Sequence, residues 1–185
     1  MTFLEYFDKN VMHIRLVDKD DSWFMKLIAG LLAIGNFLHI TNIKDDPTTE
    51  RDESFMGGYG TTIGNGVYDN PGWSWDKEPT THVVHELCHA VQSSIKMGLR
   101  YVFSTEWRMF YESECVQCEI LCFPGQRSDA WFERRVRQFV KYGVEESVVR
   151  RELSKRLEEL DRAEPRASAA RVADALTFWK QGHGA

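Results

Sequence analysis

Two histidines and a glutamate at residues 85–89 have the types and the spacing of a zinc site. In "HELCH", His85 and His89 are four residues apart, so on a helix both imidazoles lie on one face and can bind one ion. Glu86 lies about 100° round the helix axis, where its carboxylate can reach a water on that ion. Two imidazoles and a third ligand leave one zinc position open for water, and the metal lowers the pKa of that water toward about 7. The pattern therefore predicts hydrolysis, with Glu86 as the general base.

The residues around the two histidines predict the rigid helix that a metal site needs. Pro79 and either Thr80 or Thr81 are helix-start signals and Gly98 is an end signal, so we expect a helix from about Thr81 to Met97. The other side chains near the motif are apolar, namely Val83, Val84, Leu87, Ala90 and Val91. The helix is therefore expected to be buried, and two buried histidines need polar partners or a metal.

A second helix with acidic side chains follows at a suitable distance for a third ligand. The segment "TEWRMFYESECVQCEI" should form a helix from about residue 105 to residue 122, where "FPG" breaks it. Glu112 lies 23 residues after His89, which leaves room for a loop and an antiparallel helix. Glu114 is the other candidate, and because the two glutamates are two residues apart they point to nearly opposite faces. Hydrophobicity alone does not choose between them.

The remaining segments indicate the fold class. Only "TTIGNGVY" is convincing strand material, with two short extended runs around residues 63–68 and glycines that suit a turn. The apolar stretch from Phe24 to Ile40 contains a lysine and falls short of the ~20 residues that cross a bilayer, so we expect a buried helix and no membrane anchor. From residue 128 onward the sequence is helical and charged, with breaks at Gly143 and Pro165. The sequence thus predicts an α+β, mostly helical fold with a small sheet or hairpin beside the two helices.

Length and composition limit the classes of function. A chain of 185 residues with 43% hydrophobic residues has the length of one domain and can bury a sizeable core. The net charge of -5 carries no basic excess to neutralise phosphates, so no nucleic-acid partner is expected. The segment "MTFLEYFDKNVMHIRLVD" lacks the basic start and the apolar run of a secretion signal, which favours a cytoplasmic protein.

Four cysteines occur at positions 88, 115, 118 and 122, and the last three share one face of the second helix. Disulfides are not expected in a cytoplasmic protein, and free cysteine behaves as a small buried hydrophobe. We therefore expect Cys88 to pack against this cysteine-lined face. The alternative is a second metal site held by Cys115, Cys118 and Cys122, for which no fourth ligand lies near in sequence.

Two segments resemble a known class of zinc peptidases. "HELCHAVQ" followed by "YESECVQCE" resembles the gluzincins, in which the HExxH helix is followed by a glutamate helix of the form E-x-x-A or E-x-E-A. More narrowly, "YGTTIGNGVYDNP" ahead of the motif, and Arg108 four residues before Glu112, are similar to small single-domain HExxH proteins encoded by bacteriophages and bacteria. The likeness covers about residues 54–119, roughly a third of the chain.

Carried over to this chain, the resemblance implies Zn²⁺ bound by His85, His89 and Glu112, with Glu86 as the general base. Val116 stands where many gluzincins have an aspartate that supports a histidine ligand, so the resemblance leaves that support unidentified. We expect residues 1–125 to form the zincin-like core and residues 126–185 to form a C-terminal helical extension packed on it, as a single domain overall.

The resemblance also implies a place for the substrate. In such folds the strand before the HExxH helix is a sheet edge beside the cleft, and an extended peptide pairs with it. This edge corresponds to residues 61–68, which assigns substrate binding to Thr61, Thr62, Ile63 and Gly64. A plain hairpin that closes the core is the alternative.

Hydrolysis also needs a donor for the oxyanion that forms in the transition state, a contribution of about 3 kcal/mol. Arg108, one turn before Glu112 on its face, is our first choice for this catalytic role, and Tyr111 flanks the same ligand. Tyr101 and His82 are further candidates.

These observations support three hypotheses about function. The leading one is a cytoplasmic zinc metallopeptidase that acts on a peptide or protein substrate. The second keeps the zinc without the catalysis: a virion-associated phage particle or accessory protein, whose partners are phage structural proteins or further copies of the chain. The third is a metal-free helical interaction domain in which the motif is fortuitous.

Overall fold

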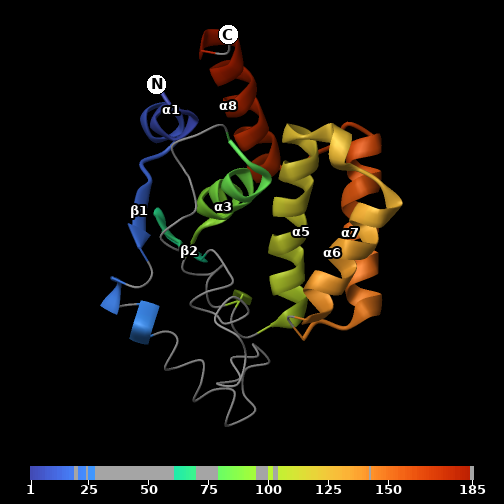
Figure 1. Cartoon of the computed structure of the whole chain (residues 1–185). Coiled ribbons are helices and arrows are strands. Elements are labelled where there is room, and N and C mark those ends of the chain that lie inside the picture. Colours follow the sequence, from blue (N-terminus) through green and yellow to red (C-terminus); the bar gives the residue numbers. More distant parts are fainter. Residues whose placement is uncertain are drawn as a thin grey trace.

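The structure, a computed structural model, describes residues 1–18, 21–23, 25–27, 61–69, 79–94, 100–101, 104–141 and 143–183. These residues form a mostly helical protein with one three-stranded sheet (Figure 1), which confirms the expected α+β class at this level. None of the helices described here is long and apolar enough to cross a membrane. The expected buried helix from Phe24 to Ile40 lies almost entirely outside the described residues.

The sheet joins the hairpin that the sequence indicated to a strand near the N-terminus. This strand corrects the expectation that only the hairpin segment forms strands. β1 (Arg15–Asp18) pairs in parallel with β3 (Gly66–Asp69), and β2 (Thr61–Ile63) pairs with β3 in the antiparallel direction. The strand order β1-β3-β2 leaves β2 at one edge of the sheet as described. The hairpin turn passes through Gly64 at φ +64°, a left-handed conformation that glycine adopts without strain.

Two helices carry the histidine motif and the proposed third ligand. α3 (Thr81–Gln92) begins after Thr80, whose hydroxyl accepts a hydrogen bond from the amide of Val83. α5 (Thr105–Cys122) begins after Ser104, which caps its first turn in the same way, and its bounds match those expected from the sequence. The two helices pack directly on each other, so residues of the motif can meet residues of α5.

The motif helix ends earlier than the sequence indicated. We expected it to continue to about Met97, but α3 ends at Gln92, and Ser93 is extended with φ -60° and ψ 127°. Ser93 and Ser94 account for the early end, because serine side chains compete with the backbone hydrogen bonds of a helix. Gln92 is therefore the last residue of the helix, three residues after His89.

The C-terminal part of the chain packs against the helices that carry the motif. After the short 3-10 turn η2 (Pro124–Gln126) come α6 (Asp129–Lys141), α7 (Glu146–Asp161) and α8 (Ala167–His183). The expected breaks at Gly143 and Pro165 fall between these helices. α5 contacts both α7 and α8, and α8 also contacts α3 and the N-terminal helix α1 (Phe3–Asn10) (Figure 1).

Two hydrophobic clusters hold the helices together, and α5 contributes to both. One cluster lies between α1, α3, α5 and α8 and includes Leu87 and Val172. The other lies between α5, α6 and α7 and includes Trp131 and Leu153. Both clusters combine residues from before and after position 126, so the C-terminal helices share their core with the motif helices.

Candidate metal centre

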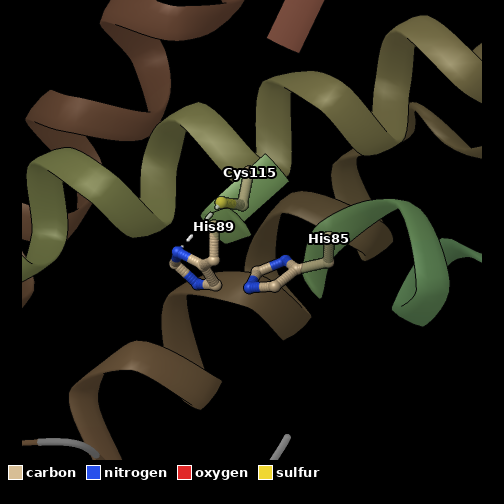
Figure 2. Close-up of side chains that lie close together, drawn as sticks. All are labelled: His85, His89 and Cys115. Atoms are coloured by element: carbon tan, nitrogen blue, oxygen red, sulfur yellow. Dashed lines mark hydrogen bonds between the residues drawn. The ribbon is translucent and has the colours of Figure 1, made fainter. Parts of the chain in front are cut away.

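Two imidazoles and one carboxylate meet between α3 and α5. His85 and His89 lie side by side on α3 with their rings close together (Figure 2). The Nε2 atom of His85 is 3.1 Å from Oε2 of Glu112, and the Nε2 atom of His89 is 3.4 Å from Oε1 of the same carboxylate. His89 and Glu112 are buried and His85 is half-buried. The structure thus brings together the three residues that the resemblance assigns to the metal.

The other ring nitrogen of His85 is held by a second carboxylate. Its Nδ1 atom lies 2.7 Å from Oε1 of Glu119, and the other oxygen of Glu119 accepts a hydrogen bond from Arg135 of α6. Since a carboxylate only accepts, Nδ1 of His85 donates to Glu119 and Nε2 donates to Glu112. If the ring loses one proton to bind a metal, Nε2 is the nitrogen that becomes available while Nδ1 keeps its bond to Glu119. Glu119 therefore gives His85 the support that Val116 cannot give.

Glu114, the other glutamate that the sequence left open, contacts different groups. Its Oε2 atom accepts hydrogen bonds from Nε2 of Gln92 at 2.8 Å and from the hydroxyl of Ser168 at 2.9 Å. The Oε1 atom of Gln92 in turn lies 3.0 Å from Nδ1 of His89. Glu114 therefore reaches the site through Gln92, whereas Glu112 contacts both imidazoles.

Cys115 is a further candidate ligand at the two histidines, where the sequence suggested packing or a separate cysteine metal site. Ligand atoms of His85, His89 and Cys115 all lie within 4.8 Å of one another, so these three side chains can hold a metal ion. The Sγ atom of Cys115 is 3.3 Å from Nδ1 of His89 (Figure 2). Glu112 faces the Nε2 atoms of both rings, whereas Cys115 faces the nitrogen of His89 that Gln92 also contacts. Burial raises the pKa of the Cys115 thiol well above its usual value, which favours the uncharged thiol in the metal-free protein.

Three of the four cysteines form one buried group between α3 and α5. Cys88, Cys115 and Cys118 are buried, and the thiol of Cys118 donates to the backbone oxygen of Val84 at 3.6 Å. All three belong to the cluster that contains Leu87. This confirms the expectation that Cys88 packs against the cysteine-lined face of the second helix.

Glu86 is held by the edge strand of the sheet. Its side chain is buried, and the hydroxyl of Thr62 in β2 lies 2.8 Å from its Oε2 atom. Because a hydroxyl can donate one hydrogen bond, this contact orients the carboxylate of Glu86. Of the other residues assigned to substrate binding, Thr61 pairs with β3 in the hairpin, and Ile63 and Gly64 are exposed at its turn.

The candidates for the oxyanion donor contact different groups. Tyr101 donates its hydroxyl to Oε1 of Glu112 and so reaches the proposed ligand. Arg108 is buried, donates its Nε to the backbone oxygen of Tyr101 at 3.2 Å and lies over the ring of Tyr101. The ring of Tyr111 packs against two neighbouring aromatic rings of α5. Tyr101 therefore contacts the carboxylate of Glu112, and Arg108 supports Tyr101.

Opposite charges gather between α3 and α5. Burial alone would lower the pKa of His85, but hydrogen bonds to Glu112 and Glu119 raise that pKa well above its usual 6.5. Burial opposes the charge of His89 as well, yet the nearby charge of Glu112 raises its pKa. Conversely, burial would raise the pKa of Glu112, but the charge of His89 and the hydrogen bond from His85 hold it well below its usual 4.5. A metal that binds here must therefore displace protons from the imidazoles.

Stabilisation of the protein by zinc is expected to increase as the pH rises. Without metal, the raised pKa values of His85 and His89 stabilise the folded protein at a pH below their ordinary pKa of 6.5. This stabilisation is lost as the pH rises through the pKa values of the folded state. With zinc the same imidazoles must be unprotonated, so the difference in Tm between zinc-loaded and metal-free protein should grow from about pH 6 to about pH 8. Thermal unfolding in both states measures this difference.

A variant in an exposed histidine is the control for this experiment. His13→Asn lies outside the site and should keep the pH dependence, whereas His89→Ala should remove it. A difference in Tm that is the same at both ends of the pH range would contradict proton displacement from the two imidazoles.

No related protein supports a function for this site. Comparison with protein-family models, with curated proteins and with solved structures finds no match to this chain. The resemblance to gluzincins therefore stays a prediction based on the two segments that carry it. The function has to be inferred from the side chains that meet between α3, α5 and β2.

Proposed function

We propose that this protein is a zinc-dependent peptidase in which His85, His89 and Glu112 hold the metal. The observation that carries the proposal is the approach of both imidazole Nε2 atoms to one carboxylate, at 3.1 and 3.4 Å. Two nitrogens and an oxygen are a donor set of catalytic zinc sites, in which a fourth position stays open for water. Support for this choice comes from the Nδ1 atoms, which are engaged by Glu119 and Gln92.

Residues of this chain supply the proton transfer and the orientation that hydrolysis needs. Zinc in such a site lowers the pKa of a bound water and polarises the peptide carbonyl. Glu86 accepts the proton of the water and returns it to the leaving amine. The hydroxyl of Thr62, at 2.8 Å, keeps the carboxylate of Glu86 in one orientation. Tyr101 donates to the developing oxyanion, a role worth about 3 kcal/mol, by giving up its hydrogen bond to Glu112, since a phenol has one hydrogen to donate. Arg108 holds Tyr101 in place.

The proposed substrate is a peptide in extended form. β2 is an edge of the described sheet, and it also carries the hydroxyl that contacts Glu86. A peptide that pairs with this edge would therefore run past the general base, with backbone hydrogen bonds that do not depend on its sequence. The exposed side chain of Ile63 lies on the same strand and is available to such a peptide.

Cys115 is the observation that favours a second candidate function. If its thiolate joins His85, His89 and Glu112 on the metal, a fourth protein ligand takes the place of the water. Zinc sites closed by four protein ligands are structural, as in a phage particle or accessory protein that does not cleave peptides. Replacing zinc by cobalt distinguishes the two functions, because a cobalt–thiolate charge-transfer band in the absorption spectrum appears only when the thiolate is bound.

Removal of the metal is expected to abolish peptide cleavage. Zinc-loaded protein should cleave peptides of a mixed-sequence library, a chelator should reduce the rate to background, and added zinc should restore it. Mass spectrometry of the library before and after incubation measures the cleavage. Cleavage that survives full removal of the metal would contradict the proposal. A library left intact by protein with full zinc content would support the non-catalytic alternative.

A further inference from the structure

The side-chain amide of Gln92 has only one orientation that satisfies its neighbours. Its Nε2 atom lies 3.1 Å from the backbone oxygen of Tyr111 and 2.8 Å from Oε2 of Glu114. Both of these oxygens accept hydrogen bonds, so the NH₂ group must face them and the amide oxygen must face His89. That oxygen is 3.0 Å from Nδ1 of His89 and also accepts from the thiol of Cys115. Nδ1 of His89 is therefore the donor, which leaves the lone pair of the neutral ring on Nε2.

Glu114 is held in place by a residue of α8 and by Arg166, which directly precedes α8. The hydroxyl of Ser168 donates to Oε2 of Glu114 at 2.9 Å, the same oxygen that accepts from Gln92. Nε of Arg166 lies 3.8 Å from the other oxygen, and Arg166 also pairs with Glu159 of α7 at 3.3 Å. Glu114 is buried, so its charge needs these partners. The orientation of His89 thus depends on a series of hydrogen bonds from Gln92 to Glu114 and from Glu114 to Ser168 of α8, which we call the relay.

We propose that Gln92 and Glu114 are positioning residues that fix the orientation and tautomer of His89 and couple zinc affinity to α8. The inference rests on the proposed zinc site and extends it beyond residue 126. It gives the C-terminal helices a part in metal binding, in addition to the core that they share with α3 and α5. Hydrogen-bonding groups behind a ligating histidine commonly change metal affinity by about 10- to 100-fold when they are replaced.

The test measures zinc affinity by competition with a chromophoric chelator, beside the thermal stability of each metal-free variant. Gln92→Leu keeps the approximate size of the side chain and removes its hydrogen bonds, and it should weaken zinc binding by about 10- to 100-fold. Ser168→Ala should weaken binding by about 2- to 10-fold, since it removes one hydrogen bond from Glu114. The exposed Gln181→Leu on α8 is the matched control and should bind zinc as the wild type does.

A paired exchange of the two relay residues separates positioning from packing. In Gln92→Glu alone, the new carboxylate lies against that of Glu114, and their repulsion should weaken zinc binding. Glu114→Gln alone should cost less than about 10-fold, because its amide oxygen can still accept from Gln92. Combining the two substitutions restores a donor between positions 92 and 114 and keeps an acceptor opposite His89, but the backbone oxygen of Tyr111 loses its donor. The double variant should therefore recover part of the affinity that Gln92→Glu loses. Its side chains have nearly the original shapes, which guards against loss of the fold.

The outcomes distinguish this inference from the zinc site on which it rests. The relay is overturned if Gln92→Leu binds zinc as tightly as the wild type, or if the double variant recovers none of the lost zinc affinity. Either result leaves the zinc site intact. Wild-type and Gln181→Leu proteins that both fail to bind zinc overturn the zinc site itself and the relay with it. Weak binding by Gln92→Leu and Gln92→Glu, with recovery in the double variant, supports the relay.

Discussion

Replacing Glu86 by glutamine is expected to lower kcat for peptide hydrolysis by about 10²- to 10⁴-fold and to leave zinc affinity unchanged. The amide keeps the shape of the side chain and can still accept the hydrogen bond from Thr62, but it cannot take a proton from water. Steady-state cleavage of a peptide found in the library measures the rate, and competition with a chelator measures the affinity.

The matched control for this variant is Glu106→Gln, an exposed glutamate in the first turn of α5. It should keep both the rate and the zinc affinity. Equal turnover by wild type and Glu86→Gln would contradict the assignment of Glu86 as the general base. Loss of zinc from Glu86→Gln would instead show that the carboxylate of Glu86 binds the metal or positions the residues that bind it.

Replacing Glu112 by alanine is expected to weaken zinc binding by more than about 100-fold, because groups that merely stand behind a ligand account for about 10- to 100-fold. The change removes one of three donors and also the negative charge that faces both imidazoles at 3.1 and 3.4 Å. Zinc competition assays measure the affinity, and peptide cleavage should fall with it.

Two comparison variants make this result specific for the third ligand. Glu114→Ala should weaken binding less than Glu112→Ala, since Glu114 acts through Gln92. Cys115→Ala should bind zinc nearly as the wild type does. Retention of zinc by Glu112→Ala together with its loss from Cys115→Ala would make the thiolate of Cys115 the third ligand.

Local signals in the sequence predicted most of the elements near the site. A threonine cap and the bounds of the glutamate helix follow from short-range chemistry, as does a hairpin turn at a glycine. The choice of Thr80 over Thr81, and of Gly64 for the turn, came only from the structure. The parallel pairing of β1 with β3 was not predictable, because it joins residues about 50 positions apart and leaves no local pattern. The early end of α3 was not predicted, because the expected end signal was Gly98, whereas the helix ends at Gln92.

The part of the candidate site that lies within a single helix was predictable from the sequence. The four-residue spacing of His85 and His89 places both rings on one face, and that geometry is present in α3. The contact of Glu112 with these rings agrees with the resemblance, whereas composition and periodicity left Glu112 and Glu114 open. Figure 2 shows Cys115 beside the same two rings, whereas its sequence position suggested packing or a separate metal site with Cys118 and Cys122.

The supporting groups were harder to predict, because they come from distant parts of the chain. Glu119 lies on the same face of α5 as Glu112, two turns further on, so its spacing was the available signal for a partner of His85. Arg135 reaches Glu119 from α6, and Ser168 reaches Glu114 from α8. Such contacts depend on how the C-terminal helices pack, which no short motif records.

A crystal structure of the protein with bound zinc tests the central claim most directly. We expect one zinc ion at about 2.0–2.2 Å from Nε2 of His85, Nε2 of His89 and an oxygen of Glu112, with water in the fourth position. A zinc ion bound instead by the Sγ atom of Cys115 at about 2.3 Å, or no zinc at the two histidines, would contradict it.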